Sequence, residues 1–80
     1  MIPWTLAFVL LSTETGREQQ VLQHLKGIEG VKNAYVVYGL YDVVVEIEGQ
    51  NQDAIRTIVR SKIRNLHGIK STLTLVVTPG

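Results

Sequence analysis

Two runs of β-branched and aromatic residues follow each other between residues 34 and 48, separated by Gly39 and Leu40. Residues of these types pack well on a pleated surface and are typical of β-strands. Glycine at the first central position of a two-residue turn supplies the positive φ that a type II′ turn needs. The stretch therefore predicts a tight β-hairpin in which Tyr38 pairs with Tyr41.

Asp42 is a carboxylate at the start of the second of these strands, which is otherwise very apolar. Because side chains alternate along a strand, one face carries Asp42, Val44, Glu46 and Glu48, and the other carries Tyr41, Val43, Val45 and Ile47. The residues alone leave two interpretations of Asp42 open. It either accepts hydrogen bonds from nearby backbone N–H groups and fixes the turn, or it binds a polar or cationic group of a ligand.

The N-terminal part of the chain predicts a strand followed by a helix. Residues 4 to 11 are apolar at both odd and even positions, as expected for a central strand that is covered on both faces. The sequence Thr15-Gly16-Arg17-Glu18 matches a capping box, in which the Thr and the Glu satisfy each other's backbone donors. Apolar residues then recur at helical spacing, so we expect a helix from about residue 16 to residue 28.

The C-terminal part of the chain predicts a second helix and a last strand. Asn51 suits the N-cap position of a helix that begins near residue 52 and ends at Gly68. Residues 71 to 78 then alternate between apolar side chains and mostly threonine, as a half-buried strand does.

These elements have the order βαββαβ in a chain of 80 residues, which is the size of one small domain. Short connections and right-handed crossovers favour a ferredoxin-like α+β fold, with a four-stranded antiparallel sheet and both helices on one face. The other face is left bare, and exposing even four apolar side chains there would forgo roughly 6 kcal/mol. We therefore expect a symmetric dimer of the dimeric α/β-barrel type, in which two sheets pack face to face.

The net charge of +1 conceals an uneven distribution of charge. Residues 1 to 55 carry a net charge of −4, and residues 56 to 80 carry a net charge of +5. Three arginines of the second helix are spaced by four residues and form one exposed stripe: Arg56, Arg60 and Arg64. Such a stripe is usually a solvated surface, and its functional alternative is an acidic partner or the Glu46 and Glu48 of a neighbouring subunit. Nucleic acid is a poorer partner because the whole domain carries so little positive charge.

No set of residues in the sequence matches a catalytic, metal or cofactor site. There are no cysteines, and His24 and His67 have no second histidine or carboxylate at the spacing of metal ligands. No serine lies in a nucleophile elbow, and no glycine-rich phosphate loop follows the first strand. We therefore expect a protein that is not an enzyme and that has no catalytic residues, metal or cofactor.

Residues 2 to 11 are hydrophobic but do not match a signal peptide or a membrane span. They lack a basic region and a small-residue cleavage site, and they are too few to cross a bilayer. The absence of cysteine also suits an intracellular protein. We expect a cytoplasmic protein that does not bind a membrane.

The sequence Gly-x-Tyr-Asp at residues 39 to 42 stands before an apolar strand, within the run Val37 to Val45. Gly30-Val31 precedes this run, and the threonine-bearing stretch Leu66 to Thr74 follows it. In this pattern nearly the whole chain resembles the effector-binding domain of Lrp/AsnC-type (feast/famine) regulators, called the RAM domain. The resemblance implies a βαββαβ domain that dimerises through its sheets and assembles into octamers or decamers, with small molecules, usually amino acids, held between dimers.

The resemblance also implies where the ligand binds. The hairpin supplies the first set of ligand-binding residues: Gly39, Leu40, Tyr41 and Asp42. Gly39, Tyr41 and Asp42 are expected to contact the ammonium and carboxylate ends of the ligand. The last strand is expected to complete the pocket from a neighbouring subunit, through Ser71, Thr72 and Thr74.

Full-length regulators of this family begin with a helix-turn-helix, whereas this sequence opens directly with the first strand. We therefore expect a domain without specific DNA binding, which senses an amino-acid effector alone or in assemblies with full-length regulators. Three alternatives stay open. They are a structural or protein-interaction module with a vestigial site, an amino-acid-binding ACT domain with its ligand near Thr13 to Arg17, and a small monooxygenase of the dimeric ferredoxin-like kind.

Overall fold

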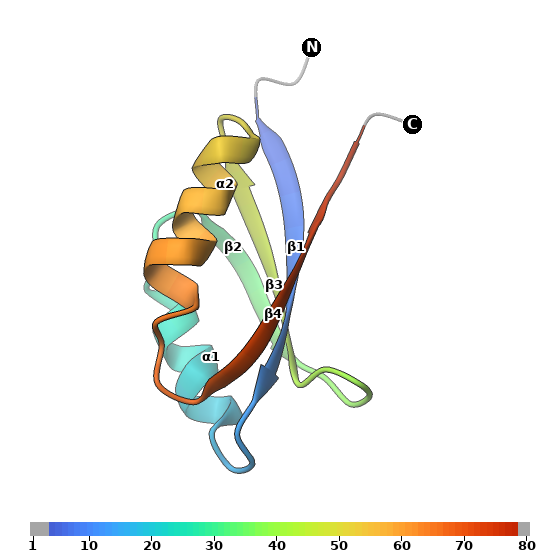
Figure 1. The fold of residues 1–80 in the computed structure, drawn as a ribbon, viewed down its shortest axis with the longest axis vertical. Helices are drawn as coiled ribbons and strands as arrows, with labels where there is room; N and C mark the ends of the chain where they lie inside the picture. Colours follow the sequence, from blue (N-terminus) through green and yellow to red (C-terminus); the bar gives the residue numbers. More distant parts are fainter. Residues whose placement is uncertain (1–3, 79–80) are drawn as a thin grey trace.

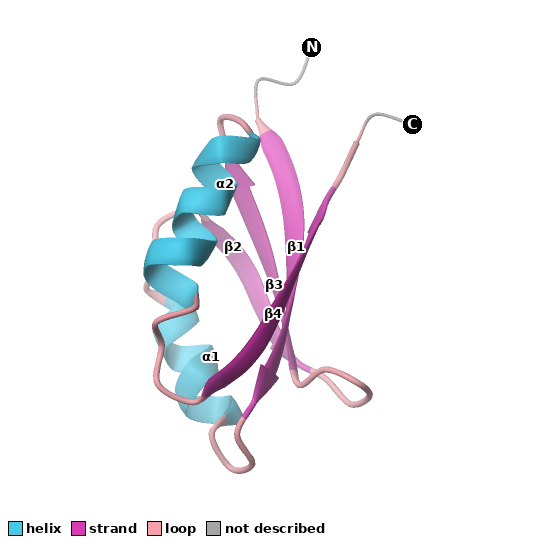
Figure 2. Ribbon diagram, viewed as in Figure 1, coloured by secondary structure: helices cyan, strands magenta, loops and turns pink. Residues whose placement is uncertain are grey.

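The structure, a computed structural model, describes residues 4–78 of the chain. In chain order its elements are β1 (Thr5–Thr13), α1 (Glu18–Lys26), β2 (Val31–Val36), β3 (Val43–Gly49), α2 (Gln52–Ile58), the π-helical turn η1 (Val59–Ile63) and β4 (Ile69–Val76). The strands form one antiparallel sheet in the order β2-β3-β1-β4, and both helices cover the same face of it (Figure 1, Figure 2). The predicted ferredoxin-like βαββαβ fold is confirmed.

β1 is the central strand of this sheet. It pairs with β3 on one side and with β4 on the other. Its odd-numbered residues from Ala7 to Leu11 are fully buried beneath the helices, whereas its even-numbered residues from Leu6 to Leu10 are only half-buried on the opposite face. The predicted central strand is therefore confirmed, but within the described part of one chain the helices cover only one of its two faces.

The hydrophobic core lies between the covered face of the sheet and the helices. Its buried members are Ala7, Val9, Leu11, Val21, Leu25, Val43, Val45, Ile47, Ile55, Val59 and Ile63. On β3 every second residue is buried, as strand alternation predicts. On α1 the two buried residues are four positions apart, which places them on one face of the helix. The sequence pattern therefore predicted correctly which faces of these elements meet.

The opposite face of the sheet, called the open face below, is covered by no element of residues 4–78. It is formed by Leu6, Phe8, Leu10, Tyr35, Val44, Leu73 and Leu75. The strand register places Leu75 beside Phe8 and Leu73 beside Leu10. Leu75 is 48% exposed and Leu73 is 43% exposed. The exposed apolar side chains are therefore contiguous, which is typical of an interaction surface.

α1 begins later than predicted. Its N-cap is Arg17, which makes no side-chain cap, whereas the capping box placed Thr15 at that position. A tight turn comes first, closed by a 3.0 Å hydrogen bond from the Arg17 N–H to the Glu14 carbonyl. The Glu18 carboxylate then accepts the N–H of Gly16 at 3.1 Å, one residue beyond Thr15. The predicted capping box is wrong because Thr15 lies inside this turn and not at the N-cap, so Glu18 accepts the N–H of Gly16 and not that of Thr15.

α2 begins where predicted and widens before it ends. The Asn51 side chain caps it by accepting the N–H of Ala54 at 2.8 Å. Within η1 the helix is wider, and the Arg64 N–H donates to the Val59 carbonyl at 2.9 Å, five residues back. The helical stretch ends with η1, before the predicted end at Gly68, because tight turns replace the last helical turn.

The hairpin between β2 and β3 is wider than predicted. The last strand pair is Val36 with Val43, and the loop is closed by a 2.8 Å hydrogen bond from the Val37 N–H to the Asp42 carbonyl. The N–H of Asp42 instead donates to Leu11 of β1 at 2.8 Å. In a regular strand the N–H and carbonyl of one residue point to the same neighbour, so Asp42 interrupts the ladder. The predicted two-residue turn, with Tyr38 paired to Tyr41, is therefore wrong.

The burial pattern of α1 predicts unequal effects of two identical substitutions. Leu25→Ala should lower the free energy of unfolding by about 2 to 5 kcal/mol, because it leaves a cavity in a fully buried site. Leu22→Ala, on the half-buried flank of the same helix, should cost clearly less. Urea unfolding of both variants measures the difference, and equal losses would show that the face of α1 is assigned wrongly.

Candidate functional site

Asp42 is a half-buried residue at the point where the hairpin joins β1. Its Oδ2 accepts the backbone N–H of Thr13 at 2.8 Å, across 29 residues of sequence. The interpretation of Asp42 as an acceptor of backbone hydrogen bonds is thus confirmed, although the donor lies in β1 and not in its own turn. Within residues 4–78 this N–H is the one protein donor to the Asp42 side chain. The carboxylate is therefore held in place through one oxygen, and Oδ1 remains free to bind another group.

The loop beside Asp42 contains the other predicted hairpin residues and extends past the end of the sheet (Figure 1). Leu40 is 94% exposed, and Tyr41 is half-buried. Gly39 has the positive φ that was predicted, +141°, and no atom lies within 4 Å of the place where a Cβ would stand. In a single chain the loop therefore offers an accessible backbone and a fixed carboxylate, but few walls around a ligand.

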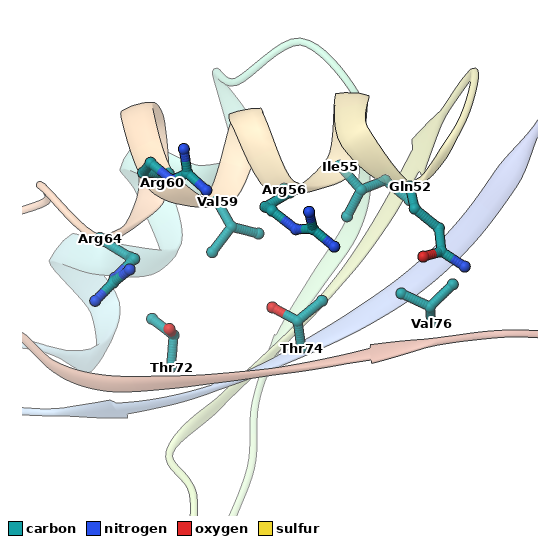
Figure 3. Close-up of a pocket in the computed structure, with 9 residues that line it drawn as sticks. All are labelled: Gln52, Ile55, Arg56, Val59, Arg60, Arg64, Thr72, Thr74 and Val76. Carbon is teal, nitrogen blue, oxygen red and sulfur yellow. The ribbon is translucent and has the colours of Figure 1, made fainter.

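The three predicted residues of β4 do not lie on one face of the sheet. Ser71 pairs with Ser12 and is exposed on the same side as the open face. Thr72 and Thr74 point the other way, toward α2 and η1 (Figure 3). One chain thus brings Ser71 to the end of the sheet where Asp42 lies, and it places Thr72 and Thr74 in a different site.

That different site is a groove between α2 with η1 on one side and β4 on the other, called the arginine groove below (Figure 3). Its volume is about 370 Å³. The polar residues that line it include all three arginines of the stripe and two threonines: Arg56, Arg60, Arg64, Thr72 and Thr74. Both sets were noted in the sequence, but their proximity was not predicted, because it depends on how β4 pairs with β1.

Sequence reasoning also missed Thr13, whose N–H holds the Asp42 carboxylate. No local signal marks it, because the contact arises from the pairing of distant strands. Within residues 4–78, no group of three or more His, Cys, Asp or Glu side chains is arranged to hold a metal ion. No helix among these residues is long and apolar enough to cross a membrane.

Comparison with known proteins identifies the family of this fold and hairpin. A family model described as the Lrp/AsnC ligand binding domain matches residues 6–79. An uncharacterized HTH-type transcriptional regulator of Pyrococcus furiosus is 31% identical over 75 residues, which are 90% of this chain and 50% of that protein. The crystal structure of FFRP-DM1 matches with a TM-score of 0.87 and 35% identity, over 92% of this chain and 99% of that chain.

A more distant structure has the same fold. It is a feast or famine regulatory protein from M. tuberculosis complexed with L-methionine, with a TM-score of 0.79 and 19% identity over 95% of this chain and 51% of that chain. The chain spans about half the length of the curated HTH-type regulators that it matches. The family match includes the Gly-x-Tyr-Asp hairpin and all four strands. The chain belongs to the Lrp/AsnC ligand-binding domain family.

Proposed function

We propose that the domain is a regulatory module without catalytic activity, which binds an amino acid at the hairpin between β2 and β3. The family match supports a small-molecule ligand, and the L-methionine complex of a protein with the same fold supports an amino acid as its class. The observation that carries the proposal in this chain is the Asp42 carboxylate, fixed by Thr13 through one oxygen and free at the other.

The chemistry of the hairpin fits both ends of an amino acid. A half-buried carboxylate makes a strong, charge-assisted hydrogen bond to an ammonium group. Because β1 already holds Asp42, little ordering remains to be done when the ligand arrives. The uncovered backbone at Gly39 lets a ligand carboxylate approach closely, since no side chain stands in the way. Leu40 and Tyr41 would then contact the rest of the ligand.

The exposed loop also implies that a neighbouring copy completes the site. Under this proposal the open faces of two chains pack together, and dimers assemble further into an octamer or decamer. Ser71 in β4 of a neighbouring subunit then covers the ligand, while Thr72 and Thr74 line the arginine groove of each chain. A ligand bound between dimers stabilises their contact and is itself bound more tightly by it, because coupling between binding events is reciprocal. Full-length regulators of the family are candidate members of mixed assemblies, and the domain itself would not bind DNA.

Substitution of Asp42 separates its role in the fold from its role in binding. Screening the amino acids by calorimetry identifies the ligand, and Asp42→Asn should then weaken its binding by roughly tenfold to a hundredfold, because the charge is lost. The stability of this variant in urea should stay near that of the wild type, since an amide oxygen still accepts the Thr13 N–H. Asp42→Ala should weaken binding by a similar factor, and it should also lower the free energy of unfolding by about 0.5 to 2 kcal/mol. Unchanged affinity in both variants would remove Asp42 from the site.

Substitution on the open face tests the proposed dimer. Leu75 is 48% exposed and pairs with Phe8, so Leu75→Glu places a charge in the middle of the patch without touching the core beneath the helices. Light scattering at micromolar concentration should show a dimer or a multiple of it for the wild type, and a monomer for Leu75→Glu. Gln23→Glu adds the same charge on the exposed surface of α1 and should leave the mass unchanged. A monomeric wild-type protein would refute the dimer.

A further inference from the structure

The arginine groove has the size and lining of a small-molecule site. Its volume of about 370 Å³ falls within the range of ligand pockets, roughly 300 to 1,000 Å³. Ile55, Val59 and Val76 supply apolar contact surface, while the charged and hydroxyl groups converge from α2, η1 and β4 (Figure 3). Polar groups that converge beside apolar contact surface fix the orientation of a bound ligand and give it specificity.

The π-helical turn explains why the arginines share this groove. In a regular α-helix four residues overshoot one turn by about 40°, so the side chains of Arg56, Arg60 and Arg64 would fan progressively around the helix. A turn closed by a hydrogen bond five residues back holds more residues, so the next four residues fall short of a full turn. The shortfall brings Arg64 back toward the direction of Arg56. Figure 3 shows these two side chains on the helix side of the groove, with Thr72 and Thr74 facing them from β4.

The positive charge of the groove has little compensation within the chain. Arg56 lies 3.6 Å from Asp53, but both side chains are mostly exposed, and such pairs contribute little. No acidic side chain of residues 4–78 forms an ion pair with Arg60 or Arg64. Guanidinium groups bind carboxylate and phosphate oxygens through two parallel hydrogen bonds, and a threonine hydroxyl group can donate one more.

The glutamates of a neighbouring subunit are a poorer source of the missing negative charge. Glu48 already pairs with Lys32 at 3.4 Å, and Glu46 accepts a 2.7 Å hydrogen bond from Asn33. Both glutamates lie on the open-face side of β3, opposite the groove. A small-molecule anion is therefore a better ligand for the groove than the glutamate side chains of a second copy of the chain.

We propose that the arginine groove binds a small molecule with two or more negative charges, at a site separate from the hairpin. Arg56 with Thr74 would hold one anionic group, and Arg64 with Thr72 would hold the other. Residues two apart on a strand are separated by about 6.6 Å, so the groove suits a compact molecule with its charged groups at about that spacing. This site goes beyond the proposed amino-acid binding, because Asp42 takes no part in it.

Titration with two probes at constant ionic strength tests the site and its chemistry. Calorimetry with pyrophosphate and with citrate should show saturable binding of at least one probe, and the tighter probe tells whether the groove prefers phosphoryl or carboxylate groups. The double variant Arg56→Gln/Arg64→Gln should bind it roughly tenfold to a hundredfold more weakly. Lys26→Gln/Lys62→Gln removes the same net charge from the exposed helix surface outside the groove and should change the affinity less than about twofold.

Three results would overturn the proposal. The first is the absence of saturable binding of both probes. The second is an equal loss of affinity in the arginine and lysine variants, which would show attraction by net charge alone. The third is a loss of probe affinity in Asp42→Asn, which would show that the probe binds at the hairpin and not at a separate site. The substituted arginine and lysine side chains are exposed and outside the core, and the new amide oxygen in Asp42→Asn can still accept the Thr13 N–H, so unfolding does not obscure these comparisons.

Discussion

The pairing of β1 with both β3 and β4 is the constraint on which the other features depend. With Val9 and its odd-numbered neighbours buried beneath the helices, strand alternation forces Phe8 and its even-numbered neighbours onto the open face. One strand thus contributes to the core on one side and to the exposed apolar surface of the open face on the other. The same strand supplies the Thr13 N–H that holds Asp42, and its pairing with β4 turns Thr72 and Thr74 toward the helices.

The parts of the fold that depend on local pattern were predicted from the sequence. Helical spacing, strand alternation and the Asn51 cap were sufficient for the order of elements and for the side of the sheet that the helices cover. The hairpin was predicted wrongly because the N–H of Asp42 donates to Leu11 of β1 while its carbonyl accepts from Val37, and the position of β1 cannot be inferred from residues 37 to 42. The π-helical turn also had no signal in the spacing of the arginines.

The candidate sites show the same division between local and distant contacts. The sequence singled out Asp42 as a carboxylate at the start of an apolar strand, and the structure adds that a backbone N–H of β1 holds this carboxylate. The predicted residues of β4 proved to lie on both sides of the strand, so a single chain does not place all of them at the hairpin. The arginine groove could not be predicted from the sequence, because it depends on the register of β4 beside β1 and on the widened helical turn η1.

The central claim is that the hairpin fixed by β1 is where this Lrp/AsnC ligand-binding domain receives its amino acid. The most direct measurement is a titration of isotopically labelled protein followed by the chemical shifts of its backbone amides. The account predicts that the largest shifts upon amino-acid binding occur at Gly39 to Asp42 and at Thr13, whose N–H touches the Asp42 carboxylate. Shifts concentrated in the turn at residues 14 to 17, with the hairpin unchanged, would contradict it and would favour binding after the first strand, as in an ACT domain.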